Sequence, residues 1–554
     1  ETVSPGQWSD PLYWVRQVRR PVLFARALAA LRQHAVTAYL EAGPGAALTT
    51  MVEHAELGDV VAVPVLPRNR PEVPSVLTGL GQLYVHGRDV DFRPAVTGGR
   101  RVDLPTYPFQ RKRYWLTTSA AVRPARSGPT VDSIRYRISW TPLPRATEPV
   151  LTGRWLVVAR TEDLDGGLVG GCLDALRAHG AAPCLVGVDR EHLAATIDQV
   201  RSQEGDPICG VLSLLGHDGD AYATLALVQS LHVLDAPLWC TTRGAVAIDS
   251  AERVEHPEQA TIWGLGLTVA AEHPGRWGGL VDLPGTVDDI AGRHLVGVLA
   301  GQVGTEDQIA IRESGCHGRR LVPATVERPA GTPWQPTGTI LVTGGTGALG
   351  ARVARWLASA GAKHLVLTSR RGPQADRARD LSAELEASGV RVTVVAADVA
   401  DRSAVRNLLA SMPADQPLTA VFHVAGVVAD GVLSTLDPDR FDLVLRPKAT
   451  AARHLHELTR ELDLAAFVLF SSVAGTWGSA GQANYAAANA YLSALAEQRR
   501  FDGLAATAID WGPWCGDGMA AGQVGTSLRR AGLRGLDPDL ATAALQLAYQ
   551  VRAV

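Results

Sequence analysis

A glycine-rich loop between two apolar segments constrains the fold of this chain more than any other feature. Residues 339–342 read Thr-Ile-Leu-Val, typical of a buried strand, and the segment after the loop has helical apolar periodicity that Gly361 ends. Between a strand and a helix, glycines permit a tight turn and let the backbone approach a pyrophosphate closely. The N–H groups at the helix N-terminus then donate to the phosphates. We therefore predict a dinucleotide-binding α/β unit. The predicted contact residues of the loop are Thr343, Gly344, Gly345, Thr346, Gly347, Leu349 and Gly350.

The ends of the following predicted strands indicate which dinucleotide binds. The strand at 364–368 is followed by Ser369, Arg370 and Arg371, where an NAD site places a carboxylate and an NADP site places cations. A hydroxyl and two guanidinium groups favour NADPH, with charge-assisted hydrogen bonds worth about 1.5–3 kcal/mol each. Further cofactor contacts are predicted after the third strand, from Asp398 to the adenine and from Val399, and after the fourth, from His423, Ala425 and Gly426.

Polar side chains downstream of the loop form a candidate catalytic set. Ser472 closes the apolar run 467–471, so its hydroxyl is expected at a strand's carboxyl end, where open α/β sheets bind ligands. Tyr485 and Asn489 lie four residues apart in an alanine-rich helical segment and share one face. With a ketone between Ser472 and Tyr485, the nicotinamide can supply hydride, Tyr485 the proton, and Ser472 a hydrogen bond to the developing alkoxide.

Lys448 is the fourth member of this set, because a free tyrosine with a pKa near 10 needs help at neutral pH. A lysine ammonium about 4 Å away, at an effective dielectric constant near 20, is worth about 4 kcal/mol. Lys448 is therefore expected to lower the pKa of Tyr485 by up to roughly 3 units, before its own desolvation is counted. Asn489 is expected to hold a water molecule or Lys448 in place.

Residues 134 to about 330 show a similar alternation of strand-like and helix-like segments. Strands are predicted at 154–159, 183–188, 210–215 and 245–248, which indicates a mostly parallel sheet. After the first strand, however, the sequence is Arg-Thr-Glu-Asp-Leu-Asp, with acids where a phosphate loop needs glycines and backbone donors. We expect a nucleotide-type fold that binds no nucleotide, as in a duplication with one inactive copy.

The composition narrows the classes of function. A chain of 554 residues is too long for one core, and a net charge of −3 gives no electrostatic argument for nucleic acid or an anionic membrane. The six cysteines are scattered without a Cys-x-x-Cys pair, so we expect reduced thiols, no metal site and a cytoplasmic location. There is no signal peptide and no apolar run near 18 residues, which argues against membrane insertion. The chain begins at Glu1 without methionine and ends at Val554, which suggests a piece of a longer protein.

The catalytic set resembles that of the short-chain dehydrogenase/reductase superfamily, with one difference. The usual Tyr-x-x-x-Lys is Tyr485-x-x-x-Asn489 here, and the lysine comes from Leu445-Arg446-Pro447-Lys448. The chain resembles the ketoreductase domain of modular type I polyketide synthases in three features. They are this exchange, the glycine loop and a preceding half without such a loop. The resemblance implies an α/β fold with two Rossmann-like subdomains, one without a cofactor site and one of the short-chain dehydrogenase/reductase type, after a small α+β linker region. It also implies NADPH-dependent reduction of a β-ketoacyl thioester on the phosphopantetheine arm of an acyl carrier protein.

The same resemblance divides the chain into five parts. They are the C-terminal end of an acyltransferase domain (1–52), the linker after it (53–116), a flexible linker (117–133), a structural subdomain (134–330) and a catalytic subdomain (331–554). No Gly-x-Ser-x-Gly occurs in the first part, so we expect no acyl transfer. The implied partners are the acyl carrier protein and the acyltransferase and ketosynthase domains of one multifunctional enzyme of antibiotic biosynthesis. There is no room for a dehydratase or an enoylreductase domain, and the family continues after residue 549 with a final strand.

The family also implies residues near the substrate. Pro513 and Trp514 match the stretch beside the nicotinamide, residues 515–526 match a lid that is mobile until ligands bind, and Gln482 and Met519 match substrate positions.

For stereochemistry the residues disagree. Asp430 retains the last Asp of the loop that accompanies B-type reduction to the D-hydroxyl, whereas Trp477, eight residues before the tyrosine, accompanies A-type reduction to the L-hydroxyl. Residues 430–433 keep the spacing of the B-type loop, and the residues around Tyr485 depart from the sequence common in A-type domains. We therefore predict B-type reduction.

Two alternative functions remain open at this stage. The first is a redox-inactive relative that acts as a scaffold or only epimerises an α-substituent; such relatives often lack the tyrosine or disturb the lysine or the asparagine. The second is a free-standing dehydrogenase of small metabolites, which the inactive half and the acyltransferase-like start disfavour.

Overall fold

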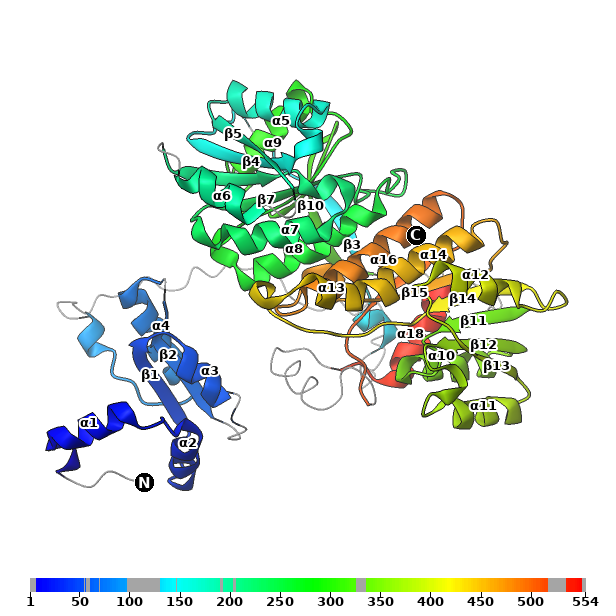
Figure 1. Ribbon diagram of the computed structural model, residues 1–554, viewed down its shortest axis with the longest axis horizontal. Coiled ribbons are helices and arrows are strands. Elements are labelled where there is room, and N and C mark those ends of the chain that lie inside the picture. Colours follow the sequence, from blue (N-terminus) through cyan, green and yellow to red (C-terminus); the bar gives the residue numbers. More distant parts are fainter. Residues whose placement is uncertain are drawn as a thin grey trace, which may run out of the picture. The chain divides into compact units, whose positions relative to one another are not determined.

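The computed structural model describes residues 6–53, 55, 60–68, 70–96, 130–145, 147–189, 193–202, 206–324, 335–516 and 535–550. The chain forms two compact units, residues 1–122 and 123–554 (Figure 1). None of the described helices has both the length and the apolar composition needed to span a bilayer.

The first unit is a small α+β structure around a two-stranded parallel sheet. Its strands are β1 (Ala38–Pro44) and β2 (Val61–Leu66), and its helices are α1 (Pro11–Arg19), α2 (Phe24–Gln33), α3 (Ala47–Glu53) and α4 (Glu72–Val85), with short 3₁₀ turns η1 (Gln7–Ser9) and η2 (Arg93–Val96). Helix α4 packs closely on β2, because a Cβ at Gly79 would lie 3.2 Å from the side chains of Val63 and Val65.

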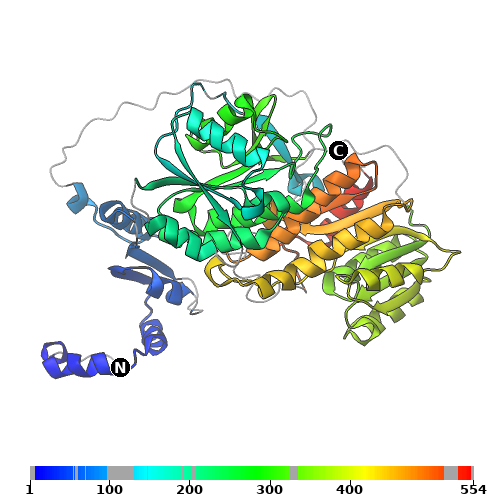
Figure 2. The ribbon, with the colours of Figure 1, turned by 45° about the horizontal axis from the view of Figure 1, so that its top comes forward.

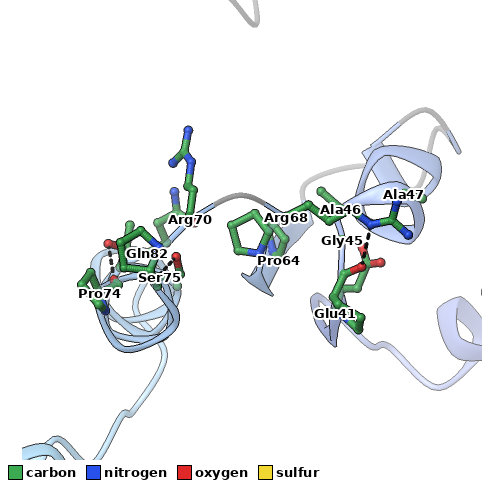
Figure 3. A pocket seen from close by; sticks show the side chains of 15 residues that line it. Glu41, Gly45, Ala46, Ala47, Pro64, Arg68, Arg70, Pro74, Ser75 and Gln82 are labelled. Carbon is green, nitrogen blue, oxygen red and sulfur yellow. Dashed lines mark hydrogen bonds between the residues drawn. The ribbon is translucent and has the colours of Figure 1, made fainter. Parts of the chain in front are cut away.

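An open pocket in this unit is lined by α4, the loop before it and the end of β1 (Figure 3). Its polar side chains bond within the unit. The Ser75 hydroxyl donates to the Pro71 carbonyl at 2.7 Å, the Thr78 hydroxyl donates to the Pro74 carbonyl at 2.8 Å, and Glu41 accepts from the backbone N–H and the hydroxyl of Thr49. The Ser75 and Thr78 hydroxyls thus donate to the carbonyl group one turn earlier, a common arrangement for Ser and Thr in helices.

The second unit contains two sheets, and the first of them defines what we call the eight-stranded half (Figure 1). The strand order is β3-β10-β9-β8-β7-β6-β4-β5, parallel from β5 to β9 and antiparallel at β10 and β3. The strands are β3 (Tyr136–Pro142), β4 (Arg154–Arg160), β5 (Ala182–Val188), β6 (Ile208–Ser213), β7 (Leu238–Arg243), β8 (Trp277–Leu283), β9 (Gln308–Arg312) and β10 (Gly315–Pro323). The helices are α5 (Gly167–Ala178), α6 (Leu193–Ser202), α7 (Ala221–Ser230), α8 (Ala260–Glu272) and α9 (Asp289–Leu299).

The predicted strand at 245–248 is wrong. The strand in this position is β7, which ends at Arg243, and Gly244 follows it with a left-handed φ of +65°. The next residues take their backbone partners from side chains, since Ala245 donates to Asp282 and Ile248 donates to Glu252. The short apolar run 245–248 is therefore a loop held by the carboxylates of Asp282 and Glu252. Hydrophobic periodicity alone does not distinguish such a loop from a short buried strand.

The second sheet defines the six-stranded half, a doubly wound parallel sheet of order β13-β12-β11-β14-β15-β16. Its strands are β11 (Thr339–Thr343), β12 (His364–Ser369), β13 (Arg391–Ala396), β14 (Leu418–His423), β15 (Ala466–Ser472) and β16 (Thr507–Trp511). Helices α10 (Ala348–Ser359), α11 (Ala378–Ala387) and α18 (Pro538–Gln550) pack on one face, and α12 (Arg402–Ala410), α14 (Ala451–Thr459) and α16 (Ala483–Phe501) pack on the other. The strand order reverses between β11 and β14, which is where such sheets bind ligands.

Two helices join the halves. Helices α8 and α16 lie against each other in both views (Figures 1 and 2). Almost all of α8 is buried, because it packs on its own sheet with one side and on α16 with the other. A Cβ at Gly264 would lie 2.6 Å from the backbone nitrogen of Ala487, so the two helix backbones are in direct contact. The first turns of α16 are thus supported by the eight-stranded half.

Candidate active site

The glycine loop between β11 and α10 has the shape that its sequence predicts. Gly344 has a left-handed φ of +67°, and a Cβ there would lie 2.8 Å from the Cα of Ala425. Gly347 precedes α10 without any side chain that caps the helix, so the first helical N–H groups point toward open loop space. This cradle would be filled by any side chain, and its donors fit the pyrophosphate of a dinucleotide.

Side chains at the ends of β12 and β13 lie where the adenosine end of such a cofactor would bind. The Ser369 hydroxyl accepts from the Gly372 backbone N–H at 3.0 Å, and exposed Arg371 pairs with Asp376 at 3.0 Å. Arg370 is also exposed and, within the described ranges, makes no ion pair. Asp398 follows β13 and accepts from the Ala400 N–H at 3.0 Å through one oxygen, which leaves the other oxygen for an adenine amino group.

His423, at the end of β14, has a second role that its sequence position did not predict. Its ring is fully buried, with Nδ1 2.7 Å from the Thr343 hydroxyl and Nε2 3.0 Å from the Lys448 carbonyl. Burial, together with the Lys448 charge, lowers the pKa of His423 to about 3, so the ring is neutral. Both ring nitrogens are occupied, so the contribution of His423 to a cofactor would come from its backbone, while its ring supports Lys448.

The structure brings the four predicted catalytic residues together at the carboxyl end of β15. Lys448 lies on a short π-helix, η11 (Arg446–Thr450), the kind of local widening that often marks functional sites. Its ammonium donates to the Asn489 side-chain oxygen and to the Phe470 carbonyl, both at 2.8 Å. It also lies 5.4 Å from the centre of the Tyr485 ring. Asn489 donates back to the Tyr485 carbonyl at 2.7 Å, so it holds Lys448 as expected.

The expected direction of the Tyr485 pKa shift is wrong. Burial raises the pKa of Tyr485 above its usual value, and hydrogen bonds to Ser472 and Asn489 offset only part of this. Burial likewise lowers the pKa of Lys448 to about 7, against the opposing effect of Asp510. The expectation from a distance and a dielectric constant left out the desolvation of the buried phenol, which favours the neutral form of Tyr485.

Two polar residues pair with each other close to Tyr485. The Gln482 amide donates to both carboxylate oxygens of Asp430, at 3.2 and 3.1 Å, and burial raises the pKa of Asp430. Trp477 ends the short helix α15 (Ala474–Trp477) and is 45% exposed. Met519 and most of the predicted lid lie outside the described residues.

The stretch after β16 is fixed by packing. The Trp514 ring is buried and lies edge-on to Trp511 with ring centres 5.0 Å apart, and the Pro513 carbonyl accepts from the Leu536 N–H at 2.6 Å. Within the described ranges, no group of three or more His, Cys, Asp or Glu side chains is arranged to hold a metal ion.

Sequence reasoning missed a partly buried polar group behind the candidate catalytic set. Asp510, in β16, accepts from Thr476 at 2.6 Å and from Ser493 at 2.8 Å. Arg319, from the eight-stranded half, donates to the Thr476 carbonyl at 2.7 Å. The available signal was an aspartate inside the run Thr507–Trp511, which otherwise reads as a buried strand.

Comparisons with known proteins match both halves. Residues 338–516 match the family described as "KR domain", and residues 138–321 match "Polyketide synthase extender module SpnB, Rossmann fold domain". Among curated relatives, polyketide synthase GfsA of Streptomyces halstedii is 45% identical over 98% of this chain and 8% of its own length. The pikromycin polyketide synthase component PikAIII of Streptomyces venezuelae is 43% identical over 96% of this chain and 33% of its own. The chain thus spans a third or less of these relatives.

One solved structure, described as an A1-type ketoreductase, has a TM-score of 0.72 to this chain. It is 46% identical, and the match covers 76% of this chain and 92% of that one. The part of this chain that it covers is large enough to include both sheets of the second unit.

Proposed function

The chain belongs to the ketoreductases of modular polyketide synthases, and on that premise we propose that it reduces a β-ketoacyl thioester with NADPH during chain extension. The observation that carries this proposal is the set Lys448, Asn489, Tyr485 and Ser472 at the carboxyl end of β15, in the same sheet as a glycine loop shaped for a dinucleotide. We further propose that the substrate is carried on the phosphopantetheine arm of an acyl carrier protein.

The residues of the site act on the ketone oxygen. When bound, NADPH supplies hydride to the carbonyl carbon. The Ser472 hydroxyl accepts from the Ala474 N–H at 3.3 Å and hydrogen-bonds to Tyr485, and with a ketone bound between the two side chains it would donate to the ketone oxygen as charge develops there. Tyr485, kept protonated by the raised pKa of its phenol, donates the proton that completes the alcohol. Lys448 and Asn489 hold the tyrosine and stabilise the phenolate that this transfer leaves.

A spectrophotometric assay tests the proposal directly. The chain, given a β-ketoacyl thioester of N-acetylcysteamine, should consume NADPH, seen as loss of its absorbance, and form the β-hydroxyacyl thioester. No consumption, with NADPH bound and the protein folded, would instead support the redox-inactive scaffold or epimerising alternative. The presence of all four catalytic residues favours the reducing enzyme.

Cofactor choice should depend mainly on Arg370. Arg371 is engaged with Asp376, whereas Arg370 makes no ion pair in the part of the chain that the structure describes. We expect Arg370→Ala to raise the KM for NADPH about tenfold, the loss of one charge-assisted hydrogen bond, with the KM for NADH nearly unchanged. Arg371→Ala should have the smaller effect.

Steady-state kinetics of both variants with each cofactor measure this difference. Glu384→Gln is a matched control, since it removes an exposed arginine pair, to Arg355, in the same half. An equal loss for NADPH and NADH would mean that the arginines serve the fold instead of the 2′-phosphate.

For the stereochemistry, the B-type outcome stays a prediction, supported by Asp430 and its two hydrogen bonds with Gln482 close to Tyr485. A second candidate, A-type reduction, is favoured by the similarity to a structure described as A1-type and by the exposed Trp477. Chiral chromatography of the reduced thioester distinguishes them. The D-alcohol is expected if Asp430 directs the substrate arm, and a dominant L-alcohol would show that Trp477 does.

We also propose the domain division predicted from sequence for this chain. The first unit ends at residue 122 and the second contains both sheets, a boundary that falls within the predicted linker at 117–133. The first unit would then be the end of an acyltransferase domain with its linker, and the ketosynthase and acyltransferase domains of the same module would be partners.

A further inference from the structure

Glu272, the last residue of α8 in the eight-stranded half, reaches across to two loops of the other half. One carboxylate oxygen accepts from the Leu433 backbone N–H at 2.9 Å, and the other accepts from the Gly481 backbone N–H at 2.7 Å. These two N–H groups belong to separate loops of the six-stranded half, so a single carboxylate bridges them. Hydrogen bonds to an ionised acceptor are the stronger kind.

The bridged loops are the ones that carry the hydrogen-bonded pair Asp430 and Gln482. The Gly431 N–H donates to the Gly481 carbonyl at 2.8 Å, and Gly431 and Gln482 form an isolated parallel bridge. Asp430 directly precedes Gly431, and its hydrogen-bond partner Gln482 is the other residue of the bridge. Fixing Leu433 and Gly481 therefore fixes the position of Asp430 relative to Gln482.

A second side chain of the eight-stranded half holds the same loop. Gln229, in α7, donates from its amide nitrogen to the Leu433 carbonyl at 2.7 Å and to the Leu436 carbonyl at 2.8 Å. Leu433 is thus fixed at its N–H by Glu272 and at its carbonyl by Gln229. By contrast, Gly478 and Gly481, with φ near +78°, give the loop after Trp477 no stiffness of its own.

We propose that Glu272 is a positioning residue that sets the position of the hydrogen-bonded pair Asp430 and Gln482 beside Tyr485, and so controls which face of the ketone is presented to the cofactor. This inference rests on the proposed ketoreductase function. It assigns to the half without a glycine loop a part in stereoselectivity, through Glu272 with Gln229 in support.

The test compares Glu272→Gln, Glu272→Ala and Gln229→Met with the unmodified chain. In Glu272→Gln an amide N–H₂ faces one of the two backbone N–H groups, so one hydrogen bond is lost while the shape is kept. We expect the ratio of the two alcohol stereoisomers from a β-ketoacyl N-acetylcysteamine thioester to fall about tenfold, with a raised KM for the thioester and an unchanged Kd for NADPH. Glu313→Gln, an exposed glutamate in the turn between β9 and β10, is the matched control.

Amide hydrogen exchange at Leu433 and Gly481 provides a readout that does not depend on turnover. Exchange at both amides should rise in the Glu272 variants and stay the same in Glu313→Gln. An unchanged stereoisomer ratio with turnover intact, unchanged exchange at both amides, or a loss of NADPH binding as large as the loss of selectivity would each overturn the inference. If the unmodified chain consumes no NADPH, the proposed function fails, while the exchange measurement still decides whether Glu272 holds the two loops.

Discussion

Tyr485→Phe is expected to lower kcat by about 10²-fold or more, the usual scale for removing a general acid, while the Kd for NADPH stays unchanged. The phenol is the group at the site that can give the proton, because Ser472 is a far weaker acid and Lys448 is occupied by Asn489 and the Phe470 carbonyl. Phenylalanine keeps the ring, so the packing of α16 is preserved. Single-turnover reduction of the thioester, followed by NADPH absorbance, measures the effect on the chemical step.

A tyrosine on the same helix is the matched control for this variant. Tyr491 is buried, and burial raises the pKa of its phenol, as it does for Tyr485. Tyr491→Phe removes the same hydroxyl from α16 and should leave kcat within about twofold, since it makes no contact with the reacting atoms. Near wild-type turnover of Tyr485→Phe would show that the proton comes from elsewhere, and the assignment would be wrong.

The part of this site that depends on local spacing was predictable from the sequence. A glycine loop between a strand and a helix, a serine at the end of a buried strand, and two side chains four residues apart on a helix each follow from short-range geometry. The structure brings Ser472, Tyr485, Asn489 and Lys448 together as that reasoning expected. The mostly parallel sheets were also predicted, with one strand displaced to β7.

What the sequence could not give is set by contacts between distant residues. The sign of the Tyr485 pKa shift depends on burial, which is a property of the assembled fold. The hydrogen bonds of Glu272 join positions 161 and 209 residues apart, and nothing in the local sequence marks Glu272 as different from other glutamates at the end of a helix. The buried ring of His423 shows the same limit, since its partners come from two other elements.

Gly264→Ala is expected to have the second large effect, because Gly264 is where α8 crosses α16. A Cβ there would lie 2.6 Å from the Ala487 backbone nitrogen, closer than real Cβ contacts. Alanine favours a helix over glycine by about 1 kcal/mol, whereas overpacking a well-packed interior typically costs about 1–3 kcal/mol. The obstacle here is backbone, which cannot rotate away as a side chain can, so the cost should exceed the gain and the helices should separate.

Separation would be felt at the catalytic residues, since Ala487 lies between Tyr485 and Asn489 in α16. A displacement of about 1 Å at a reacting group can cost about 10²-fold in rate, so we expect kcat to fall by about 10–10²-fold and the Tm to fall by several degrees. Binding of NADPH should change less, because the glycine loop lies between β11 and α10 of the six-stranded half. Gly275→Ala is the control, as a Cβ there would meet nothing within 4 Å. If Gly264→Ala kept both its Tm and its kcat, α16 would position Tyr485 without support from the eight-stranded half, and the close contact between the two helices would have no part in catalysis.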